Sequence, residues 1–197
     1  MPIEHWFPTP IYYGFARDEN IDAIQKELLD ADSKATYAKA SDGYSWHTLT
    51  HSISTPIFEA NIIKDNNLLL TESEIGWHLK QYLPHLTDNN NFFIKTSWLT
   101  RNSKHEFAYK HKHTPTDCDI AGCYYIQTNG NDGNIRFWNN NELSNDYCFF
   151  GNNQKVSYAP QVGKILLFPA WLVHEVTENL TDDLRISLAF NIRFNRD

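Results

Sequence analysis

Residues 184–194, "LRISLAFNIRF", alternate apolar and polar side chains over almost their whole length. Successive side chains of a β-strand point to opposite faces of a sheet. One face of this strand is apolar and carries Ile186, Leu188, Phe190, Ile192 and Phe194. The other face carries Arg185, Ser187, Ala189, Asn191 and Arg193. The pattern predicts a long strand whose two faces meet different surroundings.

Two arrangements would satisfy this strand in a closed sheet. In the first, the apolar face fills the interior of a barrel, and the arginine-bearing face lies in water. In the second, helices cover the apolar face, and Arg185 and Ser187 point into the barrel. The second arrangement explains more of the sequence, because amphipathic helices need an apolar surface to cover.

The chain from Asn91 onward is expected to form a series of short strands. These runs are rich in β-branched and aromatic residues, and Gly, Asn, Asp and Pro separate them. They cover residues 92–100, 121–128, 134–138, 155–159, 164–168, 172–177 and 184–194. Such a series is typical of an all-β sandwich or barrel, here a jelly-roll-like body.

Two helices are expected before these strands. Residues 18–32 repeat apolar side chains at helical spacing, and Asn20 can cap their start. Thr71 and Glu74 fit a capping box, in which a hydroxyl begins a helix and a carboxylate follows three residues later. Pro84 is expected to end this second helix, because proline has no N–H to donate.

We expect a single domain over residues 1–197. Residues 1–90 would form its helical and loop portion, with a short edge strand at 11–15. Residues 91–197 would form its jelly-roll core. The loops at 40–50 and 139–153 are expected to help shape an entrance, since loops on a rigid scaffold often carry specificity.

Composition excludes several classes of protein. The net charge of −7 and the pI of about 5.7 offer no basic footprint, so we expect no binding to nucleic acid. The three cysteines form no C-x-x-C pair, so no disulfide framework is expected. The sequence shows neither a signal peptide nor an apolar run of about 18 residues. We therefore expect a cytoplasmic protein without membrane contact.

Four side chains are candidates for chemistry. His111 and His113 share one face of an extended chain, and imidazole is the commonest metal ligand. His174 follows a buried strand in "GKILLFPAWLVHEV", residues 163–176, and Arg185 comes shortly after it. Three imidazoles would hold a first-row divalent metal with open positions, and an arginine offers a two-pronged donor for a carboxylate. This combination suits a keto acid that chelates the metal and extends to the arginine.

The combined pattern resembles the Fe(II)/2-oxoglutarate-dependent oxygenases, and most closely the group of these enzymes related to prolyl 4-hydroxylases. The motif reads H-x-H…G-x-Y-Y, then G-K-x-x-x-F-P-x-W-x-x-H-x-V…N…R-I-S-x-x-F-N, and it covers roughly Trp98 to the C-terminus. Its residues here are His111, His113, Gly122, Tyr124, Tyr125, Gly163, Phe168, Pro169, Trp171, His174, Val176, Asn179, Arg185, Ile186, Ser187, Phe190 and Asn191.

The resemblance implies a mainly β fold, a double-stranded β-helix or distorted jelly roll, with the two N-terminal helices packed on the outside of one sheet. His111 and His174 would bind Fe(II), and Arg185 would bind the C5 carboxylate of 2-oxoglutarate, assisted by Ser187. The implied reaction hydroxylates a peptidyl or small-molecule substrate and releases succinate and CO2. No catalytic residue beyond the ligands of the metal and the co-substrate is expected.

The sequence leaves parts of this site open. The wider superfamily completes its metal site with a carboxylate, whereas this chain has His113 at that position. Asp117 and Asp119, in the following turn, are alternatives, although the spacing favours His113. Either Tyr124 or Tyr125 would donate a further hydrogen bond to the co-substrate. The identity of the substrate and the oligomeric state are not predictable.

Two other functions are compatible with these residues. The first is a three-histidine, cupin-like dioxygenase that uses no keto acid, and the second is a non-catalytic β-sandwich that binds a ligand or a protein. Arg185 favours the 2-oxoglutarate enzyme over the cupin-like dioxygenase, and metal binding would separate either enzyme from the non-catalytic module. His47 and His51 form an H-x-x-x-H pair, but their stretch does not resemble a helix, so we expect no zinc site there.

Overall fold

The computed structural model describes residues 8–38, 50–53, 60–140 and 154–195. Its helices are α1 (Ile21–Lys34), α2 (Ile62–Asp65) and α3 (Leu69–Tyr82), the last continued by a 3-10 turn at Leu83–His85. Its strands are β1 (Tyr12–Phe15), β2 (Thr36–Ala38), β3 (Thr50–Ile53), β4 (Phe92–Asn102), β5 (Ala108–His111), β6 (Ile120–Gln127), β7 (Ile135–Trp138), β8 (Lys155–Tyr158), β9 (Lys164–Pro169), β10 (His174–Val176) and β11 (Arg185–Phe194).

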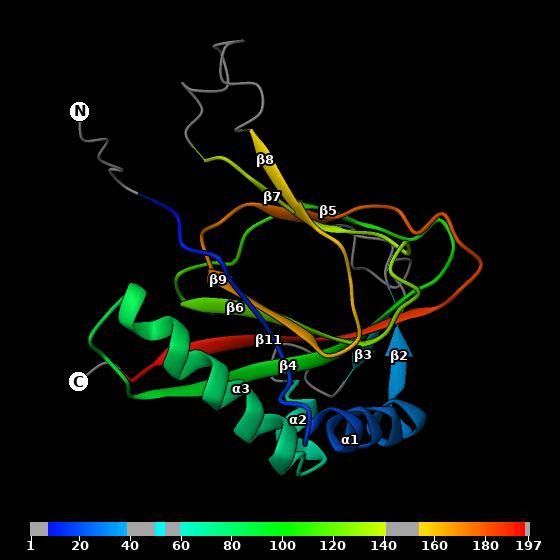
Figure 1. Ribbon diagram of the computed structural model, residues 1–197, viewed down its shortest axis with the longest axis horizontal. Helices are drawn as coiled ribbons and strands as arrows, with labels where there is room; N and C mark the ends of the chain where they lie inside the picture. The colour runs from blue at the N-terminus through cyan, green and yellow to red at the C-terminus, as the bar shows by residue number, and fades with distance from the viewer. Residues whose placement is uncertain (1–7, 39–49, 54–59, 141–153, 196–197) are drawn as a thin grey trace.

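The described chain is mainly β and forms two antiparallel sheets (Figure 1). The larger sheet has seven strands in the order β1-β9-β6-β11-β4-β3-β2, and the smaller has four in the order β5-β10-β7-β8. Apolar side chains from both sheets, among them Tyr125, Phe137 and Phe168, pack together between them. The predicted fold class is therefore confirmed. None of the helices within the described residues is long and apolar enough to span a membrane.

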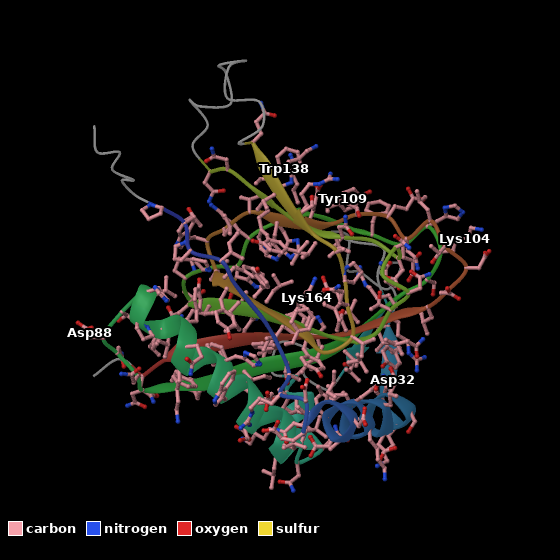
Figure 2. The ribbon with its side chains drawn as sticks, in the orientation of Figure 1. Asp32, Asp88, Lys104, Tyr109, Trp138 and Lys164 are labelled. Atoms are coloured by element: carbon pink, nitrogen blue, oxygen red, sulfur yellow. The ribbon has the colours of Figure 1, made fainter. Side chains whose placement is uncertain are left out.

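Helices cover the outer face of the larger sheet, where α1 and α3 lie side by side (Figure 1). Leu188 and Phe190 of β11 are buried there against Leu28 of α1 and Leu79 of α3. Asp32 near the end of α1 (Figure 2) accepts two hydrogen bonds from Arg101 of β4, at 3.0 and 2.6 Å, which joins the helix to the sheet. The second of the two arrangements predicted for β11 is thus confirmed.

The start of α3 differs from the prediction. The helix begins at Leu69, and Thr71 lies within its first turn rather than at the cap. The backbone N–H groups of Leu70 and Thr71 donate to the carboxylate of Glu27 in α1, at 3.3 and 3.0 Å. Glu74 accepts instead from Arg17, at 2.8 Å. The predicted capping box is therefore wrong, because a side chain from another helix supplies the cap.

Other local predictions have mixed outcomes. Asn20 stands at the N-cap of α1 as expected, but its side chain donates to Glu74 at 2.8 Å and makes no cap. Pro84 does not end the helical path at once, because it lies within the 3-10 turn that follows α3. Helix α2 and strands β2, β3 and β5 were not predicted; each is short, with only three or four residues.

Parts of the predicted entrance and the H-x-x-x-H pair fall outside the described residues. This applies to 40–49 and 141–153, and to His47. Of His51, only the backbone is described, within β3.

A matched pair of leucines in α3 tests the packing between helix and sheet. Leu79 is fully buried, whereas Leu69 is 61% exposed. We expect Leu79→Ala to lower the free energy of unfolding by about 2–5 kcal/mol, because it leaves a cavity beneath β11. Leu69→Ala should change it by less than about 0.5 kcal/mol. Urea unfolding followed by circular dichroism measures both, and equal effects of the two changes would contradict this packing.

Candidate active site

Three histidines from two strands meet at one point. His111 ends β5, His174 begins β10, and the two residues are direct partners in the antiparallel pairing of these strands. His113 lies two residues beyond β5, where its backbone N–H donates to the carbonyl of Ala170 at 2.9 Å. One ring nitrogen from each of the three histidines lies within 4.8 Å of the others. The ring centres of His111 and His174 are 4.2 Å apart.

Backbone carbonyls orient two of these rings. Nδ1 of His111 lies 2.7 Å from the carbonyl oxygen of Tyr109 (labelled in Figure 2), and Nδ1 of His174 lies 2.9 Å from that of Leu172. A carbonyl oxygen only accepts, so Nδ1 carries the hydrogen and Nε2 carries the lone pair in each neutral ring. Metal-binding histidines are commonly oriented in this way.

All three rings are held in the neutral form that binds a metal. Burial lowers the pKa of His111 and, more strongly, the pKa of His174. Burial, with the neighbouring His111 as a lesser cause, lowers the pKa of His113 to about 4. Protons therefore do not compete for these nitrogens near pH 7.

Neither alternative carboxylate joins this group among the described residues. Asp117 is exposed, with Oδ1 3.4 Å from Nζ of Lys95, and it also accepts from the hydroxyl of Thr114. Asp119 accepts from the backbone N–H of Phe194 at 3.0 Å. His113 is therefore the third member of the cluster by position.

The histidines line a cavity of about 580 Å³. The inward face of β11 contributes Arg185, Ser187 and Asn191 to the same cavity, and β6 contributes Tyr125. Tyr124 has the opposite orientation and packs into the apolar cluster beneath the helices. Of the two tyrosines, only Tyr125 therefore faces the cavity.

Arg185 is buried without an acidic partner. Its side chain is 2% exposed, and Nη1 donates to the carbonyl oxygens of Gly133 at 2.6 Å and Asp132 at 3.4 Å. Nε has no hydrogen-bond partner, and no ion pair involves this guanidinium within the part of the chain that the structure describes. A buried charge without a counter-ion is costly, so this end of the cavity favours an anion.

The backbone that holds Arg185 was not anticipated from the sequence. Gly133 has φ +102°, and a Cβ there would lie 2.4 Å from the carbonyl oxygen of Thr177 and 3.3 Å from Nη1 of Arg185. Glycine is required at such a position. Arg185 is held by backbone carbonyls, which any residue type supplies, so side-chain identity could not reveal these contacts. The sequence indicated only a turn at this place, through the composition of "NGNDG", residues 129–133.

Two cysteines lie near the histidines without joining them. Cys118 packs in the apolar cluster between the sheets, and Cys123 lines the cavity. Burial raises the pKa of each thiol to about 12, so both stay protonated. A protonated thiol is a poor metal ligand.

Comparison with known proteins gives this site its context. Residues 96–191 match a family model described as "Putative 2OG-Fe(II) oxygenase". The matched segment, residues 96–191, belongs to the 2OG-Fe(II) oxygenase family. Members of this family use Fe(II) and 2-oxoglutarate. No curated protein matches this oxygenase.

Solved structures share the fold of this oxygenase at low sequence identity. A prolyl-4-hydroxylase from Pseudomonas putida is 14% identical with a TM-score of 0.62, over 95% of this chain and 94% of that one. The 2-oxoglutarate-dependent epimerase SnoN from nogalamycin biosynthesis is 12% identical with a TM-score of 0.67, over 94% and 78%. HygX from Streptomyces hygroscopicus is 11% identical with a TM-score of 0.58, over 93% and 82%. The likeness shows a double-stranded β-helix.

The residues of this oxygenase fit the metal and the co-substrate of its family. Three neutral imidazoles within one small sphere suit a first-row divalent ion. Arg185 supplies a buried positive charge and an Nε without a partner among the described residues, which suits a carboxylate. Three neutral ligands would leave a bound ion with one more positive charge than two histidines and one carboxylate would.

The lowered pKa of His113 predicts how the stability of the metal-free protein depends on pH. Histidine in the unfolded chain takes up its proton near pH 6.5, whereas folded His113 does so near pH 4. Between these values the unfolded state binds more protons, so the free energy of unfolding falls as the pH falls, by roughly 3 kcal/mol for this residue. His113→Gln should make this fall smaller.

Urea unfolding in EDTA at pH 7 and pH 5 measures the effect. His85→Gln is the control, because His85 is exposed and lies outside the cluster. An unchanged pH dependence in His113→Gln would show that His113 is not held neutral by its surroundings.

Proposed function

We propose that this protein is an Fe(II)- and 2-oxoglutarate-dependent oxygenase that hydroxylates a peptidyl or small-molecule substrate and releases succinate and CO2. The observation that carries this proposal is one cavity that joins three neutral imidazoles to a buried arginine, which has no acidic partner in the described part of the chain. A cupin-like dioxygenase without a keto acid would have no use for that arginine.

His111, His113 and His174 would hold the metal. Three protein ligands leave the remaining positions of a six-coordinate ion open for the co-substrate and for dioxygen. When bound, Fe(II) with 2-oxoglutarate and dioxygen supplies an oxidative decarboxylation coupled to oxidation of a substrate C–H bond. The chain contributes fixed ring orientations through the carbonyls of Tyr109 and Leu172.

Arg185, Ser187 and Tyr125 would hold the co-substrate. Ser187 and Tyr125 are partners across β11 and β6, and both line the cavity beside Arg185. The guanidinium carbon of Arg185 lies 5.9 Å from the ring centre of Tyr125. A guanidinium with two flanking hydroxyls would anchor the C5 carboxylate by charge-assisted hydrogen bonds and so orient the keto-acid end towards the histidines.

The structural relatives carry out several different reactions. SnoN is an epimerase and SnoK a carbocyclase, whereas the Pseudomonas putida protein is a prolyl-4-hydroxylase. We choose hydroxylation because the sequence pattern lies nearest to the hydroxylase group. The free thiols of Cys118 and Cys123 are compatible with a reducing compartment, so we place the protein in the cytoplasm.

Metal binding and succinate formation test the proposal directly. The protein should bind one Mn(II), a redox-silent substitute for Fe(II), and His174→Ala should lose stoichiometric binding because it removes a ligand from the centre of the cluster. With Fe(II), the protein should convert 2-oxoglutarate to succinate. Metal binding without succinate would favour the cupin-like dioxygenase, and no metal binding would favour a non-catalytic module.

Arginine substitutions test the co-substrate site separately. Arg185→Ala should weaken binding of 2-oxoglutarate to the Mn(II)-loaded protein about 10- to 100-fold, because charge-assisted hydrogen bonds contribute about 1.5–3 kcal/mol. Mn(II) content should stay near normal. Arg136→Ala is the control, since that arginine pairs with Glu175 and does not line the cavity. Parallel loss of metal in Arg185→Ala would mean that the arginine supports the fold instead.

A further inference from the structure

Strand β11 spans more of the cavity than the co-substrate can fill. Arg185 and Asn191 both line the cavity from this strand and stand six residues apart, which corresponds to about 20 Å between their Cα atoms. The four C–C bonds of 2-oxoglutarate extend over no more than about 6 Å. If Arg185 anchors the co-substrate, as proposed above, Asn191 lies in a part of the cavity that the co-substrate leaves open.

The histidine cluster faces this same part of the cavity. Asn191 pairs with Ala121 of β6, and Ala121 pairs with Phe168 of β9, so the three residues form one row across the larger sheet. The ring centre of Phe168 lies 4.7 Å from that of His174. A molecule resting on this row would therefore lie beside the metal ligands and away from Arg185.

The side chain of Asn191 has an unused acceptor. Asn191 is 8% exposed, and its Nδ2 donates to Oγ1 of Thr96, its cross-strand partner in β4, at 3.0 Å. Its Oδ1 has no hydrogen-bond partner among the described residues. Buried acceptors are almost always paired, so the position of this one in the wall of a cavity points to a ligand that donates to it.

The geometry of this group indicates the chemistry of that ligand. A carboxamide has two N–H donors and one acceptor oxygen in one plane. With one N–H donated to Thr96, Asn191 keeps its other N–H and its acceptor oxygen, which can form one edge towards a ligand. Such an edge pairs in two-pronged fashion with a group that offers the same two functions, as asparagine does with adenine. Amides match this edge, whereas a lone hydroxyl satisfies only one of its two functions at good geometry.

We propose that Asn191, oriented by Thr96, is a specificity-determining residue that recognises an amide group of the substrate beside the C–H bond that is oxidised. The substrate is then a peptidyl residue or another amide-bearing molecule rather than a polyol. This inference rests on the proposed function, because it assigns the other end of the cavity to 2-oxoglutarate.

The test uses the full chain with Fe(II) and 2-oxoglutarate and two panels of probe compounds. One panel contains the N-acetyl amides of the twenty amino acids, and the other contains monosaccharides and polyols. At least one amide should stimulate succinate release. Asn191→Leu, which keeps the volume but removes both hydrogen-bonding functions, should reduce that stimulation at least tenfold. Thr96→Val, which only removes the orienting hydroxyl, should reduce it by a smaller factor.

Binding to the Mn(II)-loaded protein gives a readout that needs no turnover. In Asn191→Leu, the dissociation constant of the best amide should rise about tenfold, while that of 2-oxoglutarate stays within twofold of the wild-type value. The second measurement also shows that the variant is folded.

Several results would overturn the assignment. Stimulation by polyols alone, or by no amide, would exclude amide recognition. If amides stimulated succinate release equally in Asn191→Leu, Asn191 would not recognise the substrate. If Asn191→Leu bound 2-oxoglutarate more weakly, Asn191 would belong to the co-substrate site instead. Failure of the proposed function looks different, because the wild-type protein would then bind no Mn(II), or would bind Mn(II) but no 2-oxoglutarate, before any probe is added.

Discussion

Packing of the apolar face of β11 against α1 and α3 is the interaction on which the cavity depends. Side chains alternate along a strand, so burial of Leu188 and Phe190 beneath the helices turns the intervening residues inward. Arg185 and Asn191 reach the cavity for this reason. A shift of one residue in the pairing register of β11 would exchange its two faces and place a guanidinium in the apolar core. The same register therefore determines both the packing of the helices and the side chains that line the cavity.

The cavity is unusual in its charge. The three imidazoles are neutral, and the buried guanidinium of Arg185 donates to the carbonyl oxygens of Asp132 and Gly133. A metal ion would add further positive charge. A dianionic keto acid balances such a site better than a neutral ligand does, which links the histidine in place of a carboxylate to the demand for an acidic co-substrate.

The sequence could predict features that repeat along one segment, but not those that depend on distant partners. The alternation in 184–194 predicted which face of β11 meets the helices, and turn residues marked the core strands. The start of α3 was missed because Glu27, far away in the chain, accepts its N–H groups. The sequence could not show which of Tyr124 and Tyr125 faces the cavity. Strand β6 is buried on both faces, so it lacks the alternation of polar and apolar residues that indicates which side chains point inward.

The carbonyls that orient His111 and His174 belong to residues only two positions earlier in the chain. Each ring is therefore oriented by a hydrogen bond to its own segment, and the ring of Phe168 packs against that of His174. A substitution elsewhere in the cavity wall leaves these two hydrogen bonds in place. One scaffold can therefore acquire new substrates by changes in a few wall residues.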